Sequence, residues 1–343
     1  MSDAQNAMPT LETPKKAFRA RLSSDAVVTN ILLAALLFMG LYFSFESSAF
    51  LSLRNFEVIL TNYAAVGVVA AIMALLVISG NVDLSVGSNI GLSAMVTALA
   101  VTQGNVAPGL AMLAGVGTGA AVGAVNGFLC AVLGFNPIIV TLGMLSLIRG
   151  VTLLVNSTEV YGLGDTFFWL GNGDLLGIPV LIWAVAASFL LAAVFTSFTI
   201  WGRFIYAIGI NRHAAELGAL PVKRMLFSLH TAVGAAAGIA GVLLAGRLDG
   251  ASPGSLGLQL EMQILTIVLL GGVAFAGGRG RILGVVTAWL FLGVLENGLT
   301  LLNVPPFVQL VASGLALVLA ASIDALGSWY QRLLQRRQAR MRS

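Results

Sequence analysis

Long apolar runs dominate the pattern of hydrophobic and polar positions along this chain. A helix needs about 20 mostly apolar residues to cross a bilayer. Ten stretches have the character of such spans: 27–45, 58–78, 89–103, 108–132, 136–155, 178–199, 225–246, 262–276, 282–302 and 305–325. The third and the eighth are short, and glycine-rich sequence interrupts the chain beside both. The pattern therefore predicts an all-α polytopic membrane protein with about ten transmembrane helices.

Composition supports lipid as the natural solvent of this chain. Hydrophobic residues make up 58% of the 343 residues and charged residues only 9%, whereas soluble domains carry roughly 25% charged residues. We expect an N-terminal tail at 1–25, a transmembrane domain at 26–326 and a basic tail at 327–343. The first apolar run is interpreted as an uncleaved helix rather than a secretory signal, because it has about 20 residues and further spans follow.

The distribution of basic residues predicts the orientation. Cytoplasmic loops carry an excess of Lys and Arg. Ten spans place both tails on one side, and if that side is the cytoplasm it holds 15 of the 18 Lys and Arg residues. The longest outward loop, 156–177, has three acidic residues and no Lys or Arg. We therefore expect both termini in the cytoplasm. Basic residues spread over tails and short loops are not a nucleic-acid signature.

Small residues recur at helical spacing on two predicted spans. Gly115, Gly119, Gly123 and Gly127 follow one another at every fourth position, and span 225–246 has a shorter version of the pattern. Such stripes let two helix backbones approach closely. They favour static helix packing over a surface on which helices slide.

Motifs of ATP hydrolysis and catalysis are absent from the sequence. There is no G-x-x-x-x-G-K-[ST] loop, and none of the three lysines, Lys15, Lys16 and Lys223, follows a glycine-rich turn. Nothing resembles H-E-x-x-H. The single cysteine, Cys130, permits neither an internal disulfide nor a cysteine metal cluster. We predict a transport subunit rather than an enzyme, with no cofactor and no metal site of its own.

A polar interruption follows the second predicted span. Segment 77–87 breaks an apolar stretch with Ser79, Asn81, Asp83 and Ser85. Asp83 or Ser85 can cap the next helix by accepting bonds from its free amides. Irregular backbone at membrane depth must be shielded by protein or line a wet cavity. We favour a buried helix cap, which is compatible with a moving element beside a translocation path.

The longest inward loop is 200–224. The stretch from Asn211 to Leu220 suits a short helix with Asn211 as its N-cap. A small apolar knob on it consists of Ala214, Ala215 and Leu217. An ordinary connecting loop would satisfy the same pattern.

Three segments, 81–87, 209–217 and 270–282, resemble those of the ribose/xylose/arabinose-type sugar ABC permeases, which are branched-chain-type binding-protein-dependent permeases. The order and spacing are similar from about residue 50 to 325. The resemblance implies a permease that dimerises with a second copy or a related chain in the bacterial inner membrane and imports a monosaccharide. It also implies that the loop helix docks into a groove on a separate ATPase, which binds ATP and Mg. A periplasmic sugar-binding protein would deliver the substrate.

Site residues follow from the resemblance position by position. The coupling-loop pattern matches Asn211, Ala214, Ala215, Leu217 and Gly218. The motif and gating positions match Asn81, Asp83, Ser85, Gly87, Gly277, Gly278, Gly280 and Arg281. The chain departs from the family pattern at two places: His213 replaces a glutamate, and Ala219 stands where the family has a glycine, which is displaced to Gly218.

Polar residues within spans are functional candidates, because burying a charge there is costly. Candidates for the translocation path are Asn126, Arg149, Glu296 and Asn297. Arg149 and Glu296 have matching depths in outward-going spans, which suggests an ion pair; alternatively, Arg149 extends to the outer headgroups. Hydrogen bonding between helices is the simpler interpretation of the two asparagines. His230 is interpreted as a packing residue, since one isolated histidine defines no site.

A second interpretation is an ion-coupled secondary transporter of a small polar solute. Such carriers need an intramembrane acid or a basic relay to bind the coupling ion. Glu296 is the only acid well within a predicted span, which is thin support. The sequence does not distinguish pentoses, hexoses and deoxy sugars, because all would need similar polar linings.

Overall fold

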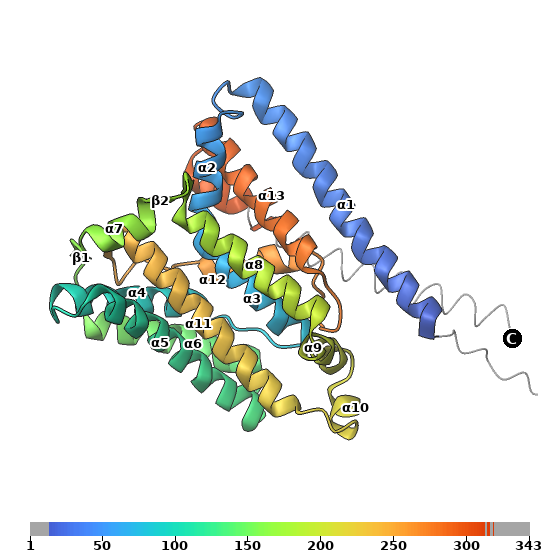
Figure 1. The fold of residues 1–343 in the computed structure, drawn as a ribbon. Helices are drawn as coiled ribbons and strands as arrows, with labels where there is room; N and C mark the ends of the chain where they lie inside the picture. The colour runs from blue at the N-terminus through green and yellow to red at the C-terminus, as the bar shows by residue number, and fades with distance from the viewer. Residues whose placement is uncertain (1–13, 313, 316–317, 319–343) are drawn as a thin grey trace, which may run out of the picture.

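The computed structural model describes residues 14–312, 314–315 and 318. Its helices, in chain order, are α1 (Pro14–Glu46), α2 (Leu53–Asn62), α3 (Ala64–Ile78), α4 (Val86–Thr102), α5 (Pro108–Gly127), the π-helix η1 (Phe128–Val132), α6 (Pro137–Val155), α7 (Asp165–Asn172), α8 (Val180–Phe198), α9 (Ile200–Ile210), α10 (Arg212–Leu217), α11 (Val222–Leu248), α12 (Leu260–Leu270) and α13 (Ile282–Leu301). The strands are β1 (Val160–Tyr161), β2 (Asp174–Leu175), β3 (Ile178–Pro179) and β4 (Gly250–Ala251). Figure 1 shows a helical bundle with these short strands at its periphery.

The predicted all-α, multi-pass character is confirmed. Six helices in the described part of the chain are long and apolar enough to cross a membrane, and α2 with α3, bent by 52°, would make a seventh span. Large apolar side chains on the outer surfaces of α1, α6 and α8 are exposed, among them Phe45 at 87% and Leu154 at 88%. Apolar surface of this extent requires a cover, which lipid supplies.

The predicted count of ten spans is not confirmed. The short third and eighth spans correspond to α4 and α12, and α12 is only 11 residues long. At about 1.5 Å per residue, a helix of that length reaches roughly half of a 30 Å hydrocarbon core. The tenth predicted span, 305–325, and the predicted N-terminal tail lie partly outside the described residues, and the predicted basic tail, 327–343, lies wholly outside them.

Helix α3 lies at the centre of the bundle. Every residue of α3 except Ile72 is buried. A helix that is apolar all round has no face for solvent and is buried on every side. It contacts α8, α11, α12 and α13, so the long apolar run at 64–78 forms a core helix rather than a lipid-facing one.

The glycine stripes of α5 and α11 pack against each other. A Cβ added to Gly119 would lie 2.7 Å from Gly238 Cα, and one added to Gly123 would lie 2.9 Å from Gly234 Cα. Both distances are far below an ordinary van der Waals contact of 3.4–4 Å. The predicted role in close helix packing is therefore confirmed.

The outward loop 156–177 contains structure that the sequence did not predict. It holds α7 and strands β1 and β2, and β1 pairs antiparallel with β4, which follows α11. Asp249 Oδ1 accepts a hydrogen bond of 2.9 Å from the Leu163 amide. Hydrogen bonds from Tyr161 and Ser252 lower the pKa of the exposed Glu159 carboxyl. Two segments predicted to face outward thus lie together.

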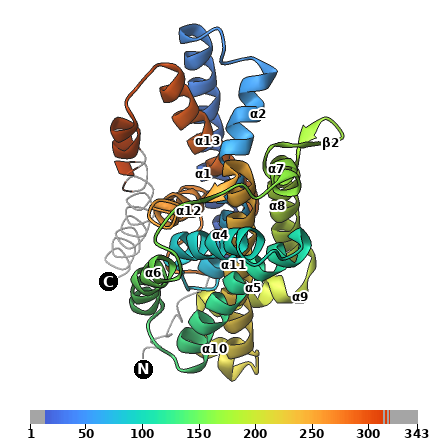
Figure 2. The ribbon, with the colours of Figure 1, turned by 90° about the vertical axis from the view of Figure 1, so that its left-hand side faces the viewer.

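Loops predicted to face opposite sides of the membrane include α10 and β2, which lie at opposite ends of the bundle. Helix α10 lies at one end, whereas α2 and β2 lie at the opposite end in both views (Figures 1 and 2). Lys223, predicted inward, reaches the carbonyl of Val132 at the end of η1, which also precedes a predicted inward loop. The arrangement is compatible with the predicted sidedness. Which end faces the cytoplasm stays a prediction from charge.

Candidate functional site

Three chain segments that are far apart in sequence meet at a glycine junction, formed by Gly80, Gly209, Gly277 and Gly278. They belong to the end of α3, the end of α9 and the turn between α12 and α13. The Gly278 amide donates a 2.7 Å hydrogen bond to the carbonyl of Ile78. A Cβ on Gly277 would lie 2.8 Å from Gly80 Cα and 3.1 Å from Gly209 Cα. A side chain at Gly209, Gly277 or Gly278 would therefore force these backbones apart, whereas a Cβ on Gly80 would meet nothing closer than 3.9 Å.

Backbone conformation gives a second reason for glycine at this junction. Gly80 has φ of +83°, Gly277 +82° and Gly278 +74°. This left-handed region is open to glycine but costs other L-residues free energy. The junction therefore needs glycine for space at Gly209, Gly277 and Gly278, and for conformation at Gly80, Gly277 and Gly278.

The α12–α13 turn is also anchored to α9 by a side chain. The Tyr206 hydroxyl donates a 2.9 Å hydrogen bond to the carbonyl of Gly280. Within the turn, the Ala274 amide donates to the carbonyl of Arg279 at 3.1 Å. Arg281 occupies the N-cap position of α13, and its side chain makes no capping bond. These contacts join α9 to the start of α13. A displacement of α9 would therefore also move the ends of α3, α12 and α13 that meet at the junction.

Helix α10 extends from this junction. Its predicted N-cap is confirmed: Asn211 Oδ1 accepts a 3.0 Å hydrogen bond from the Ala214 amide. The helix ends at Leu217 rather than at Leu220. Ala219 follows with φ of +57°, a conformation that usually selects glycine after a helix.

The predicted apolar knob on α10 needs one correction. Ala215 is only 6% exposed and packs in the core of its own chain, whereas Leu217 is 78% exposed. Ala214 is also exposed. The expectation that Ala215 belongs to the outer surface is wrong, because a six-residue helix turns its second alanine toward the bundle. Of the three knob residues, Ala214 and Leu217 are therefore available to another protein.

A buried polar cluster lies at the break between α3 and α4. Asp83 Oδ1 accepts from the Ser85 amide at 2.9 Å and from the Ser85 hydroxyl at 2.6 Å. Asp83 Oδ2 accepts a 2.9 Å bond from Asn126 Nδ2. Asp83 thus holds Ser85, the N-cap residue of α4, but the prediction that Asp83 or Ser85 caps α4 is wrong, because the N-cap side chain makes no capping bond and Asp83 bonds to Ser85 itself. Asn126 forms the expected hydrogen bond between helices. These side chains are almost completely buried. A buried carboxylate is costly unless hydrogen bonds satisfy it, and Ser85 and Asn126 supply those bonds to Asp83.

His230 faces the same carboxylate, which the sequence did not predict. Its Nδ1 lies 3.8 Å from Asp83 Oδ2, within reach of an ion pair when the ring is protonated, and the side chain is fully buried. The interpretation of His230 as an isolated packing residue is therefore incomplete. The only signal for this contact was that both groups are ionisable and lie inside the membrane domain.

The hypothesis that Arg149 and Glu296 pair is wrong. Arg149 Nη1 donates to the carbonyl of Leu256 at 2.8 Å and to that of Pro253 at 3.4 Å. Helix α6 packs on α4 and α5, whereas α13 packs on α1, α12 and α3. Matching depth placed the two charges on helices that lie apart. Arg149 instead holds the segment that precedes α12.

That segment also packs directly on α4. A Cβ added to Gly87 would lie 2.5 Å from the carbonyl of Gly257, so the backbone of the motif position Gly87 is in contact with the loop. Asn297, another candidate for the translocation path, forms two reciprocal 2.9 Å hydrogen bonds with Asn55. This pair joins α2 to α13, as expected for an uncharged polar residue between helices.

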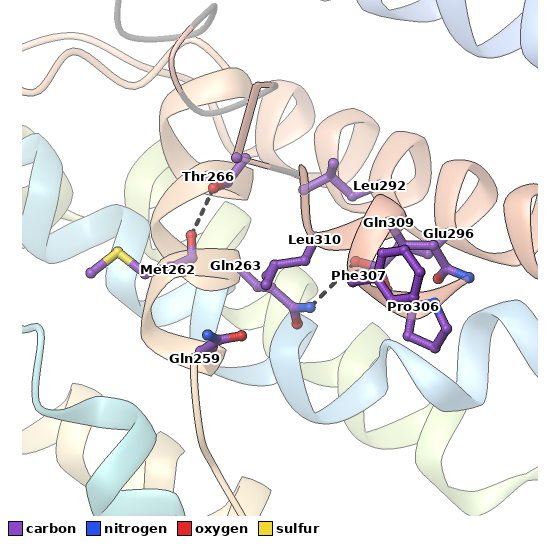
Figure 3. Close-up of a pocket in the computed structure, with 11 residues that line it drawn as sticks. Gln259, Met262, Gln263, Thr266, Leu292, Glu296, Pro306, Phe307, Gln309 and Leu310 are labelled. Atoms are coloured by element: carbon purple, nitrogen blue, oxygen red, sulfur yellow. Dashed lines mark hydrogen bonds between the residues drawn. The ribbon is translucent and has the colours of Figure 1, made fainter. Parts of the chain in front are cut away.

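A pocket of about 720 Å³ lies beside α12 and α13. Its polar lining consists of Gln259, Gln263, Thr266, Glu296 and Gln309. Its apolar lining includes Met262, Leu292, Pro306, Phe307 and Leu310. Gln263 and Glu296 point toward each other, with a 3.3 Å hydrogen bond from Gln263 Nε2 to Glu296 Oε1 (Figure 3). Of the four predicted translocation-path residues, Glu296 alone belongs to this lining.

Comparisons with known proteins agree on one family. The family described as the permease component of the branched-chain amino acid transport system matches residues 55–321. The ribose import permease protein RbsC of Escherichia coli K12 is 34% identical over 297 residues, which cover 85% of this chain and 92% of that protein. The L-arabinose ABC transporter permease protein AraH of Azospirillum brasilense is 34% identical over 276 residues, covering 80% and 81%.

A third relative extends the match further along the chain. The D-allose transport system permease protein AlsC of Escherichia coli K12 is 34% identical over 315 residues, which cover 91% of this chain and 95% of that protein. No solved structure matches the chain. The family match includes all three segments that meet at the glycine junction.

Proposed function

Because this chain belongs to the family of permease components of the branched-chain amino acid transport system, we propose that it is the membrane subunit of an ABC importer for a monosaccharide. The sugar is a pentose, a hexose or a deoxy sugar. The energy comes from ATP that a separate subunit hydrolyses. Relatives that are 34% identical are named as permeases for ribose, L-arabinose and D-allose, which supports a sugar rather than an amino acid as substrate.

The observation that carries this proposal is helix α10. It presents an exposed Leu217 and an exposed Ala214 on a short, capped helix at one end of the bundle. Apolar side chains on an exposed helix suit docking into a groove of another protein. Helix α10 directly follows α9, whose end packs against Gly277 and Gly278. A force on α10 would therefore reach the ends of α3, α12 and α13.

The motif residues have related roles in this proposal. The glycine junction and Arg281 form the turn through which α9 acts on the start of α13. Asn81, Asp83, Ser85 and Gly87 hold the α3–α4 break, which packs against α5, α11 and the segment before α12. A conformational change would move this break together with the turn.

Several partners complete the importer. A second permease copy or a related chain would form the membrane dimer in the bacterial inner membrane. An ATPase that binds ATP and Mg would contact Asn211–Gly218. A periplasmic sugar-binding protein would deliver substrate to the outward loops, which hold Glu159, Asp165 and Asp174.

Replacement of Leu217 tests the coupling role. In the complete complex, we expect Leu217→Asp to abolish both co-purification of the ATPase and sugar-stimulated ATP hydrolysis, because a charge cannot enter an apolar pocket without a partner. The matched control for co-purification of the ATPase is Leu176→Asp, since Leu176 is 87% exposed in the β2–β3 turn at the opposite end of the bundle (Figure 1). Normal assembly and ATP hydrolysis in the Leu217→Asp complex would exclude α10 as the coupling helix.

A further inference from the structure

Polar side chains at the start of α12 form one face of the pocket. Gln263 and Thr266 are three residues apart on α12, so they lie on the same side of the helix, and Gln259 directly precedes the helix as its N-cap residue. Ile264 and Ile267 of the same helix are fully buried in the core. The amides of Gln259 and Gln263 line the pocket instead.

Polar groups on this face need a polar neighbour. In a membrane domain, amides and carboxylates avoid lipid and face a water-filled space or other polar groups. Gln263 donates to Glu296, but its amide oxygen has no hydrogen-bond partner among the described residues. The amide of Gln259 is exposed and likewise has no partner in the described part of the chain. The face thus offers donors and acceptors to a solute.

We propose that this pocket binds a neutral, polyhydroxylated solute of monosaccharide size during its passage through the membrane. Amides both donate to and accept from hydroxyl groups, and the Glu296 carboxylate accepts from them strongly. The exposed ring of Phe307 supplies an apolar wall for the C–H groups of the sugar. The volume of about 720 Å³ lies within the usual range for small-molecule pockets. This inference rests on the proposed function.

The charge of the lining defines which solutes the pocket disfavours. Its described residues include one carboxylate, Glu296, and no Lys, Arg or His. A sugar acid, a sugar phosphate or the carboxylate of an amino acid would meet no cationic partner and would be repelled by Glu296. The site therefore discriminates between a neutral sugar and a branched-chain amino acid of similar size.

The position of Glu296 on α13 suits entry from outside. It lies 14 residues after Ile282, the first residue of α13, which corresponds to about 21 Å along the helix. With the predicted orientation, α13 runs outward, so the carboxylate is in the outer half of the membrane. A sugar released from a binding protein would reach this site early in its passage.

Thiol protection tests occupancy of the pocket directly. Cys130 is buried and is the only cysteine, so Cys130→Ala provides a background for single-cysteine variants of the complete, reconstituted complex. In that background, Met262→Cys reports on the pocket, because Met262 lines it and is 41% exposed, and Gln103→Cys, at an exposed position after α4, is the matched control. We expect D-ribose, L-arabinose or D-allose, whichever the unmodified complex imports, to slow labelling at position 262 by a water-soluble methanethiosulfonate and to leave position 103 unchanged. L-leucine and D-gluconate should not protect.

Glu296 variants provide a second readout. We expect Glu296→Ala to lower sugar uptake by about tenfold or more, because a charge-assisted hydrogen bond is lost, while ATP hydrolysis stimulated by the loaded binding protein continues. Glu57→Gln, on the exposed face of α2, should behave as the unmodified protein.

If the unmodified complex imports sugar but sugar does not protect the Met262→Cys thiol from labelling, or Glu296→Ala imports at the normal rate, this inference is overturned and the proposed function stands. A disulfide between two copies of the Met262→Cys variant that sugar does not prevent would also overturn it. Import of L-leucine with no import of sugar would overturn the proposed function itself.

Discussion

The contact between α5 and α11 makes a sharp prediction about single methyl groups. At Gly119, an added Cβ would lie 2.7 Å from both Gly238 Cα and Gly238 N, whereas ordinary contacts begin at 3.4 Å. The Cβ is thus about 0.7 Å too close to backbone atoms, which cannot rotate away as a flexible side chain would. Relief requires the two helices to separate along their shared stripe.

Gly117 supplies a control on the same helix. It lies two residues earlier on α5, and an added Cβ would meet nothing within 4 Å. Both Gly→Ala changes gain helix propensity of up to about 1 kcal/mol, so this gain cancels in the comparison. Overpacking of a tight interface costs about 1–3 kcal/mol. We therefore expect Gly119→Ala to be less stable than Gly117→Ala by about that amount.

The assay is equilibrium unfolding in mixed detergent micelles, followed by the fluorescence of the five tryptophans. The free energy of unfolding of each variant is compared with that of the unmodified chain. Gly117→Ala should be equal or more stable, and Gly119→Ala should be less stable. Equal free energies for the two variants would refute the direct backbone contact between the stripes.

Two further predictions concern the ends of structural elements. Ala219→Gly should stabilise the end of α10 by up to about 1 kcal/mol, because the left-handed φ of +57° costs alanine about 1–2 kcal/mol and glycine loses part of that gain through chain entropy; hydrogen exchange of the α10 amides measures this, and unchanged or faster exchange would contradict it. Arg149→Gln should lower the free energy of unfolding by about 1.5 kcal/mol, the lower end for hydrogen bonds to charged groups, because the bond from Arg149 to the carbonyl of Leu256 is lost. The control is Arg54→Gln, at an exposed position. An equal effect of the two changes would show that the Arg149–Leu256 bond does not stabilise the fold.

Local features of the sequence predicted local structure well. The N-cap Asn211 needs only its own side chain and the next turn, and the structure confirms it. The glycine stripe of α5 predicted close packing because its four-residue interval defines one helix face. The polar turn before α4 was predicted only in part: the Ser85 amide donates to Asp83 there, but the predicted side-chain cap of α4 is not formed.

Features that depend on tertiary contacts could not be predicted from the same patterns. Arg149 and Glu296 matched in depth, but depth does not determine which helices touch. Ala214 and Ala215 are chemically identical, and only the packing of α10 decides that Ala215 is buried. Helix α7 has eight residues, too few for its periodicity to stand out within a polar loop. The glycine junction joins three segments that are far apart in the sequence, and nothing in the sequence pattern predicts that they meet in space.

Solute uptake by the reconstituted complex tests the central claim most directly. Proteoliposomes that contain this chain, its ATPase and its binding protein are supplied with labelled D-ribose, L-arabinose or D-allose, either with ATP at the ATPase side or with an imposed proton or sodium gradient and no ATP. An importer driven by ATP should accumulate one of these sugars only with ATP and the binding protein present, and Leu217→Asp should abolish that uptake. Accumulation driven by the ion gradient without ATP would contradict the account and identify an ion-coupled carrier.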